Sequence, residues 1–282
     1  MRRLRGADRP RRPRLRTTRR RVTSPDEPGD VDLDDDELQI VGRLTAASNA
    51  TFVGTVRDVA VVYKPVAGER PLWDFPEGTL AQREVAAYLV SQTLGWDVVP
   101  RTWLRDGPLG PGMVQLWQEP DPQQDPVDVV PASAVPAQGW CTVLEGTDER
   151  GRPVAVVHED SVALRRMAVL DVLLNNADRK GGHVLPVAGG HRYGVDHGVT
   201  FHTEPKLRTV LWGWVGEPLD ADETAGVRRV RSEVAGELGE HLAALLAPPE
   251  VDALAERCDR LLASGRFPAP DGDASPVPWP LF

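Results

Sequence analysis

The chain has 282 residues, a formal net charge of −9 and 41% apolar residues. This length and composition predict a globular protein with a sizeable core, and no run approaches the roughly 18 consecutive apolar residues of a membrane-spanning helix. Cys141 and Cys258 match no metal-binding or redox spacing, so we expect two free thiols and a cytoplasmic protein.

The first 36 residues differ in composition from the rest of the chain. Residues 1–21 contain eleven arginines and one aspartate, and an acidic stretch follows. Prolines interrupt the arginines and no apolar stretch follows them, so we interpret residues 1–36 as a disordered leader and not as a secretory signal. The acidic body lacks the basic face of a nucleic-acid-binding protein. Contact with nucleic acid is therefore expected to be nonspecific and confined to residues 1–21.

Residues 37–119 are expected to form a lobe with a sheet and one helix. The β-branched run VAVVYKPV, residues 59–66, predicts a strand with Lys64 near its end. Lysine is rare in this chain, which contains 30 arginines but only three lysines: Lys64, Lys180 and Lys206. A position that keeps lysine is a candidate for a role that needs a compact ammonium group.

One helix is predicted in this lobe, over residues 79–95. Thr79 and Gln82 have the spacing of a capping box, and Gly95 is a natural C-terminal stop. Glu84 falls in the second turn.

The second half of the chain is predicted to be mostly helical. A 3.6-residue apolar period begins at Ser161 and ends before Asp178, which lies in the loop NNADRKGGHVL (175–185). Two short strands and then amphipathic helices are expected after this loop. The predicted fold class is α+β, a sheet lobe followed by a helical lobe. Its remaining divisions are a connector over 120–139, the helical lobe over 140–265 and a proline-rich tail over 266–282.

The order of these features resembles the protein-kinase-like fold over about residues 38–265. Phosphoinositide 3- and 4-kinases and HipA-type bacterial kinases carry Asp-Arg-His-x-x-Asn or Asn-x-Asp-x-His-x-x-Asn in the catalytic loop, followed by Asp-Phe-Gly or a relative. Here NADRKGGH (176–183) is similar to the first motif, and Asp196-His197-Gly198 to the second, 18 residues after Asp178. The chain also resembles an actinobacterial family with this distant phosphoinositide-kinase likeness.

The resemblance implies a role for each matching residue. Lys64, paired with Glu84, would bind the α- and β-phosphates of ATP, and Asp196 would bind Mg²⁺. Asp178 would accept the proton of the acceptor hydroxyl. Lys180 would contact the transferred phosphate and offset its negative charge.

The chain also departs from the pattern of these families. His183 stands where they have asparagine, which implies a preference for Mn²⁺ or Zn²⁺ over Mg²⁺, a hydrogen bond to Asp178 in place of metal binding, or a pseudokinase. No G-x-G-x-x-G motif is present, so Ser48 and Asn49 are the candidates for the phosphate-covering turn. Trp117 would lie in the hinge beside the adenine.

These features predict an ATP-dependent phosphotransferase. The segment 198–214 would face the acceptor and has only Lys206 and Arg208 as cations, which favours a protein or small-molecule acceptor over an inositol lipid. A nucleotide-binding pseudokinase and an AMP transferase on the same fold are the alternatives. A metal-dependent hydrolase is another, built from Asp196 and four nearby histidines: His183, His191, His197 and His202.

Overall fold

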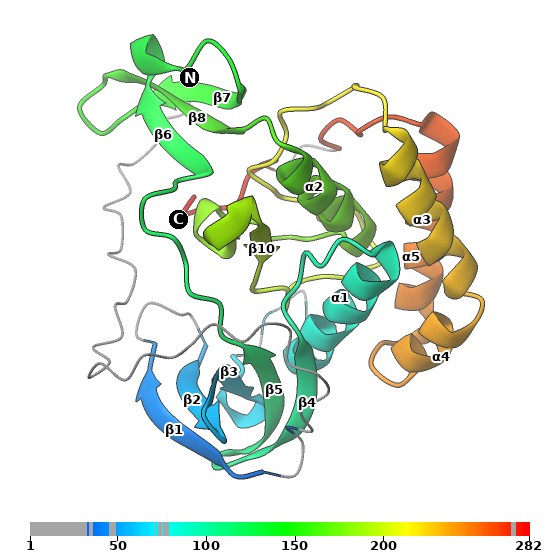
Figure 1. Cartoon of the computed structure of the whole chain (residues 1–282). Helices are drawn as coiled ribbons and strands as arrows, with labels where there is room; N and C mark the ends of the chain where they lie inside the picture. Colours follow the sequence, from blue (N-terminus) through cyan, green and yellow to red (C-terminus); the bar gives the residue numbers. More distant parts are fainter. Residues whose placement is uncertain are drawn as a thin grey trace.

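The computed structural model describes residues 33, 36–44, 49–70, 72, 75, 79–271 and 275–282. Most of the predicted leader, together with Ser48, lies outside these residues. Within them, strands and one helix come first and a mostly helical half follows (Figure 1). The predicted α+β class with two lobes is therefore confirmed.

The N-terminal lobe contains a five-stranded sheet of order β1-β2-β3-β5-β4, in which all neighbours are antiparallel. Successive side chains of a strand point to opposite faces. Val61 and Tyr63 are fully buried on one face of β3, which leaves Lys64 on the face toward α1. The strands are β1 (Leu38–Arg43), β2 (Phe52–Val56), β3 (Val59–Pro65), β4 (Thr102–Gly107) and β5 (Gly110–Leu116).

Helix α1 (Leu80–Leu94) ends at Gly95, which has the predicted left-handed conformation with φ 75°. The predicted capping box is wrong, because the Thr79 side chain makes no cap hydrogen bond. The carboxylate of Glu69 caps the helix instead and accepts the backbone N–H groups of Leu80 at 3.3 Å and Ala81 at 2.8 Å. A cap 11 and 12 residues before the N–H groups that it binds cannot be recognised from local spacing.

A three-stranded antiparallel sheet of order β6-β8-β7 occupies the region expected as a connector and the segment that follows it. Its strands are β6 (Val127–Pro131), β7 (Trp140–Thr147) and β8 (Pro153–Glu159). The short strand β6 pairs with β8, where Ala155, Val156 and Val157 are fully buried, and its own Val127 joins the main hydrophobic core. Strand pairing over this separation has no local signature, so the prediction of a connector missed it.

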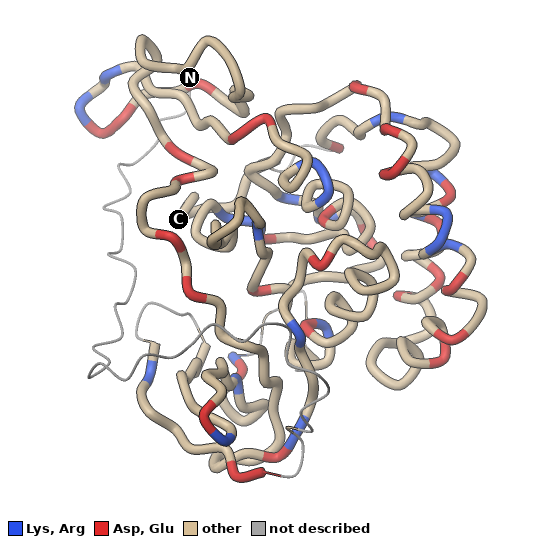
Figure 2. Tube along the Cα trace, viewed as in Figure 1, with Lys and Arg blue, Asp and Glu red and all other residues tan. Residues whose placement is uncertain are grey.

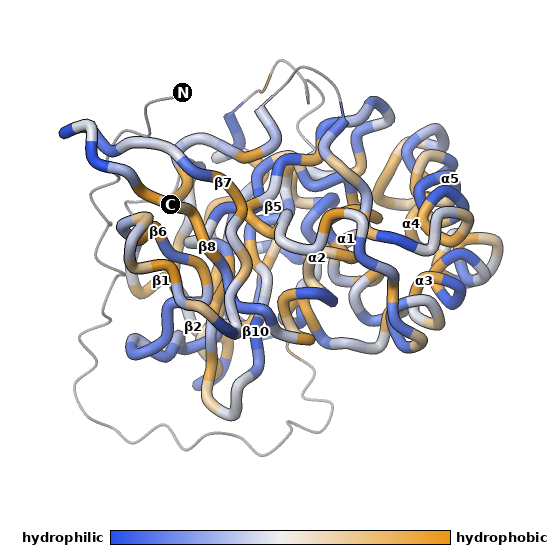
Figure 3. Tube along the Cα trace, turned by 90° about the horizontal axis from the view of Figure 1, so that it is seen from above, coloured by the Kyte–Doolittle hydropathy of each residue, from blue (hydrophilic) through white to orange (hydrophobic). Residues whose placement is uncertain are grey.

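The described part of the C-terminal half contains four α-helices, and the first of them is α2 (Val162–Leu174), whose Leu164, Met167, Leu170 and Leu174 are fully buried. Ser161 caps α2 by accepting the N–H of Leu164. Charged residues lie along the outer helices (Figure 2), on which hydrophilic and hydrophobic stretches alternate (Figure 3). The other elements are α3 (Ala221–Glu233), α4 (Glu237–Ala243), α5 (Pro248–Ser264) and the predicted hairpin of β9 (Val184–Pro186) and β10 (Arg192–Gly194). Short 3₁₀ turns occur at Val66–Gly68, Ala132–Ala134, Gly181–His183 and Ala188–Gly190.

Two further expectations concern the whole chain. Cys141 and Cys258 are both free thiols, as predicted. Among the described residues, no helix is long and apolar enough to span a membrane.

Candidate active site

Lys64 lies at the centre of a three-residue cluster between the two lobes. Its Nζ is 2.6 Å from Oε1 of Glu84 on α1 and 2.7 Å from Oδ1 of Asp196, which follows β10. Glu84 is 2% exposed, whereas the side chain of Asp196 remains 47% exposed. The structure thus brings together three residues that were predicted from separate parts of the sequence.

The electrostatics of this cluster favour the charged form of each partner. Burial opposes the charge on Lys64, but the negative charges of Asp196 and Glu84 outweigh this effect and raise its pKa above the ordinary range. The charge of Lys64 in turn holds the pKa of Asp196 well below its usual value. Asp196 is therefore an ionised carboxylate at neutral pH, as a metal ligand must be.

The backbone after Asp196 is fixed by the same glutamate. Oε2 of Glu84 accepts the backbone N–H of His197 at 2.8 Å. Asp196 itself has φ 63°, a left-handed conformation that aspartate adopts more readily than most residues. This turn directs the chain from β10 past the Lys64 ammonium.

His183 faces Asp196 and not Asp178. Its Nε2 is 3.3 Å from Oδ2 of Asp196, and its Nδ1 is buried without a partner among the described residues. Burial lowers the pKa of His183 to about 4, despite the neighbouring Asp196 charge, so the ring is neutral at pH 7. A hydrogen bond from His183 to Asp178, one of the predicted alternatives, is therefore not what the structure contains.

Asp178 and Lys180 form a second pair in the predicted catalytic loop, residues 176–183. Nζ of Lys180 is 3.1 Å from Oδ2 of Asp178. Burial raises the pKa of Asp178, although the Lys180 charge acts in the opposite direction. A carboxylate with a raised pKa is a better proton acceptor than an ordinary aspartate.

A buried polar network supports this loop, and the sequence prediction missed it. Arg179 and Asp171 are both fully buried, and Arg179 donates to both carboxylate oxygens at 2.8–3.1 Å. Asn176 donates to Asp171 at 2.9 Å and accepts the backbone N–H of Asp178 at 3.0 Å. Arg179 also donates to Nε2 of His197 at 2.6 Å. A lone aspartate in the apolar stretch of α2 was the available sequence signal, because buried carboxylates need partners.

Three further residues, Ser48, Asn49 and Trp117, were predicted to contact the nucleotide, and neither Asn49 nor Trp117 belongs to the Lys64 cluster. Ser48 lies outside the described residues. Asn49 Oδ1 accepts the backbone N–H of Arg70 at 3.1 Å, so in this structure its side chain holds a loop. Trp117 directly follows β5 and donates from Nε1 to Glu119 at 3.0 Å. Trp117 thus begins the segment that links the two lobes, which is where a hinge is expected.

The histidines proposed for a hydrolytic metal centre do not converge. Nε2 of His191 is 2.8 Å from the carbonyl oxygen of Asp97, and the ring of His202 packs edge-on against Phe75. Nε2 of His197 is bonded to Arg179. Across the described ranges, no group of three or more His, Cys, Asp or Glu side chains is arranged to hold a metal ion.

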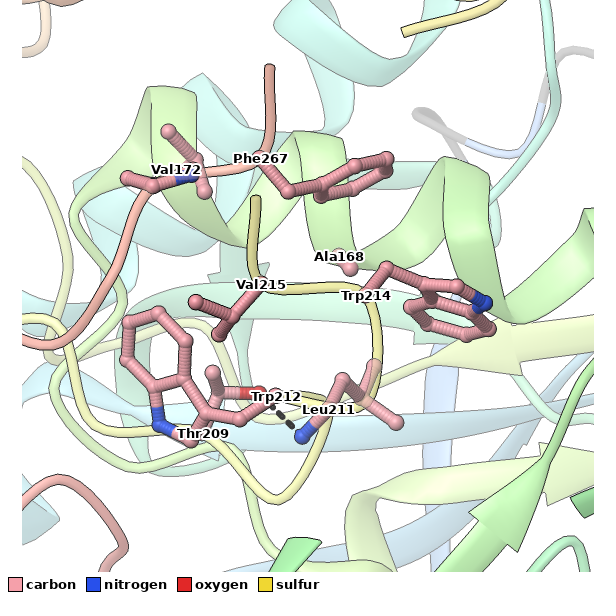
Figure 4. Close-up of a pocket in the computed structure, with 9 residues that line it drawn as sticks. Ala168, Val172, Thr209, Leu211, Trp212, Trp214, Val215 and Phe267 are labelled. Atoms are coloured by element: carbon pink, nitrogen blue, oxygen red, sulfur yellow. Dashed lines mark hydrogen bonds between the residues drawn. The ribbon is translucent and has the colours of Figure 1, made fainter. Parts of the chain in front are cut away.

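An apolar hollow lies beside α2 (Figure 4). Ala168 and Val172 of α2 line it together with Trp212, Trp214 and Phe267. Its lining contains none of the predicted site residues. The candidate active site is therefore the part-buried cluster of Lys64, Glu84 and Asp196, in which only the Asp196 side chain is largely exposed.

Comparisons with known proteins give one clear relative. Protein Rv2133c of Mycobacterium tuberculosis is 50% identical over 263 residues, which cover 89% of this chain and 94% of that protein. No protein-family model matches the chain. Among solved structures, the Helicobacter pylori proinflammatory kinase CtkA is similar, with a TM-score of 0.43, 11% identity, and coverage of 83% of this chain and 94% of CtkA. This TM-score is too low for the likeness to support a function.

Proposed function

The chain belongs to the same family as Protein Rv2133c, and we propose that it is an ATP-dependent phosphotransferase that moves the γ-phosphate to a hydroxyl group. The observation that carries this proposal is the contact of the Lys64 ammonium with both Glu84 and Asp196, at 2.6 and 2.7 Å. Kinase-like phosphoryl transfer needs a lysine paired with a helix glutamate and an aspartate that binds the metal ion, and Lys64, Glu84 and Asp196 would take these roles.

The second pair of charges supports the same chemistry. Asp178, with its raised pKa, would accept the proton of the acceptor hydroxyl. Lys180, 3.1 Å from Asp178, would stabilise negative charge on the transferred phosphate. The buried Arg179–Asp171 pair anchors this loop to α2.

The residues around Asp196 fit a divalent cation only in part. Asp196 supplies an ionised carboxylate, and His183 presents Nε2 at 3.3 Å from it. Mg²⁺ prefers six oxygen ligands and usually takes several from phosphates and water, so ATP would have to supply most of them. His183 favours Mn²⁺ over Mg²⁺ as the second ligand. Bound there, the cation would neutralise the charge of the phosphates.

The acceptor is proposed to be a protein or a small molecule. The segment after Asp196 is held by buried Asn175, which donates to the carbonyls of His202 and Glu204 and accepts the N–H of Lys206. Nζ of Lys206 lies 3.4 Å from Glu204, which offsets its charge and makes this surface a poor match for a highly charged inositol lipid. With two free thiols and ATP as substrate, we propose a cytoplasmic location.

ATP labelled separately at the α- and γ-phosphates tests the proposal. Purified protein is incubated with each label, Mg²⁺ or Mn²⁺, and a set of candidate protein and small-molecule acceptors, with Asp178→Ala as the inactive control. Transfer of the γ-label that Asp178→Ala abolishes supports the proposal. Transfer of the α-label identifies an AMP transferase, and ATP binding without transfer identifies a pseudokinase. Either of these results overturns the proposed reaction.

A further inference from the structure

The last eight residues, 275–282, run back to the predicted catalytic loop, and we call them the C-terminal strap. Figure 1 shows the C-terminal end of the chain beside the β9–β10 region. Val277 and Leu281 are 7% and 3% exposed and belong to the main hydrophobic core. The strap is therefore part of the folded protein and not a loose extension.

The first anchor of the strap lies on the segment next to the catalytic loop. The carbonyl oxygen of Pro276 accepts the backbone N–H of Thr209 at 3.0 Å and the indole N–H of Trp212 at 2.8 Å. Thr209 forms an isolated parallel bridge with Arg179. The start of the strap is therefore linked to the catalytic loop through Thr209.

The second anchor lies on the catalytic loop itself. The carbonyl oxygen of Leu281 accepts the backbone N–H of Gly181 at 2.9 Å. The ring of Phe282 covers Gly181 so closely that a Cβ at this position would lie 2.8 Å from Cδ1 and 2.9 Å from Cζ of Phe282. Only glycine leaves room for the ring at this distance. By contrast, a Cβ on the adjacent Gly182 would meet nothing within 4 Å.

The contact of Phe282 with Gly181 lies between the charged pair Asp178 and Lys180 on one side and His183 on the other. Gly181 directly follows Lys180 and begins the 3₁₀ turn Gly181–His183. Inside the protein, Asn176 and Arg179 already hold the first half of the loop. The second half of the loop begins after Lys180, and there the strap contacts Gly181.

We propose that the C-terminal strap positions the catalytic loop, with Leu281 and Phe282 as positioning residues for Lys180. The proposal rests on the proposed phosphotransfer, in which Lys180 must lie close to the transferred phosphate. A displacement of about 1 Å in a positioned group can lower a reaction rate about 100-fold. Phe282 touches neither ATP nor acceptor in this proposal and acts only through Gly181.

A double-mutant cycle in the full-length chain tests the contact. Phe282→Ala removes the ring, Gly181→Ala pushes against it, and the double variant lacks both the ring and the clash. Gly182→Ala, with and without Phe282→Ala, gives the matched control for adding a methyl group to this loop. Leu262→Ala truncates a partly buried core residue on α5 and controls for loss of stability. Readouts are kcat, KM for ATP, thermal unfolding, and hydrogen exchange at the Gly181 amide.

The strap proposal predicts a specific pattern of results. Phe282→Ala is expected to lower kcat about 10- to 100-fold with KM for ATP within about twofold, and to speed exchange at the Gly181 amide. The Gly181→Ala change is expected to add little to Phe282→Ala, because its clash is gone. The effect of Gly182→Ala is expected to be equal in both backgrounds. Leu262→Ala should lower thermal stability without this split between kcat and KM.

Two results would overturn the strap proposal. One is additive effects of Gly181→Ala and Phe282→Ala, together with an unchanged exchange rate at Gly181. The other is faster exchange with an unchanged kcat in a protein that transfers phosphate. Wild-type protein that transfers nothing refutes the proposed function instead, and the strap is then decided by the exchange rates of the same variants alone.

Discussion

The backbone N–H of His197 donates to Oε2 of Glu84 at 2.8 Å, while Oε1 of the same carboxylate contacts Lys64 at 2.6 Å. One nearly inaccessible side chain on α1 therefore connects strand β3 with the segment that carries Asp196. The two lobes meet at this carboxylate, and the position of Lys64 depends on it.

Replacing Glu84 with glutamine tests this connection. The amide keeps one acceptor but loses the charge, and charge-assisted hydrogen bonds contribute about 1.5–3 kcal/mol. We therefore expect Glu84→Gln to raise KM for ATP by about tenfold or more. The exposed Glu149→Gln removes an equal charge on the β7–β8 turn and should leave KM unchanged. Equal KM values for wild type and Glu84→Gln would contradict a role for this carboxylate.

Asp178 and Lys64 are expected to affect different kinetic constants. Asp178→Ala should lower kcat at least about 100-fold with little change in the dissociation constant for ATP, because it removes a general base. Lys64→Ala should instead weaken ATP binding. Stopped-flow or equilibrium binding of ATP to each variant separates the two effects. Weak ATP binding by Asp178→Ala would show that Asp178 contacts the nucleotide.

The buried Arg179–Asp171 pair is expected to dominate the stability of the loop. Both side chains are fully buried, so Asp171→Ala leaves an arginine without its charge partner and should cost about 3–5 kcal/mol. Asp259→Ala breaks the exposed pair with Arg231 and should cost at most about 1 kcal/mol. Denaturant unfolding measures both changes. Similar values for the two variants would mean that Arg179 finds a new partner.

Buried His158 is expected to make the folded protein less stable in acid. It is fully buried, its Nε2 accepts the N–H of Gly213 at 3.0 Å, and burial lowers its pKa below 6.5. The folded state therefore binds fewer protons than the unfolded state below pH 6.5. The contribution of neutral His158 to the free energy of unfolding is complete above pH 6.5. It is lost as the pH falls toward the pKa of His158 in the folded state, with a slope of at most about 1.4 kcal/mol per pH unit.

The variant His158→Gln tests this pH dependence. It should be less stable than wild type at pH 7.5 but should lose less stability between pH 6.5 and 5, when unfolding free energies are measured at each pH. A pH dependence as steep as that of wild type would assign the acid sensitivity to other groups, such as buried His197.

His183 is expected to determine which metal supports the reaction. Imidazole nitrogen binds Mn²⁺ better than Mg²⁺, whereas an amide oxygen suits both. His183→Asn should therefore lower the ratio of the Mn²⁺-supported to the Mg²⁺-supported rate several-fold. An unchanged ratio would indicate that His183 only donates a hydrogen bond to Asp196.

Local patterns in the sequence were enough for several elements. The β-branched run around Lys64, the start of α2 next to Ser161 and the Gly95 stop of α1 all appear where they were predicted. Each of these signals acts over a few residues, so neighbouring residue types are sufficient to identify it. The β6-β8-β7 sheet and the Glu69 cap were missed because their partners are distant in the chain.

The sequence by itself determined the α+β order of elements and which residues were candidates for the site. Only the tertiary structure decided that Lys64, Glu84 and Asp196 share one site, that His183 faces Asp196, and that Phe282 covers Gly181. The physical reason is that these contacts join residues far apart in the chain, between 13 and 132 positions. Their geometry follows from how whole elements pack, which no local period or spacing encodes.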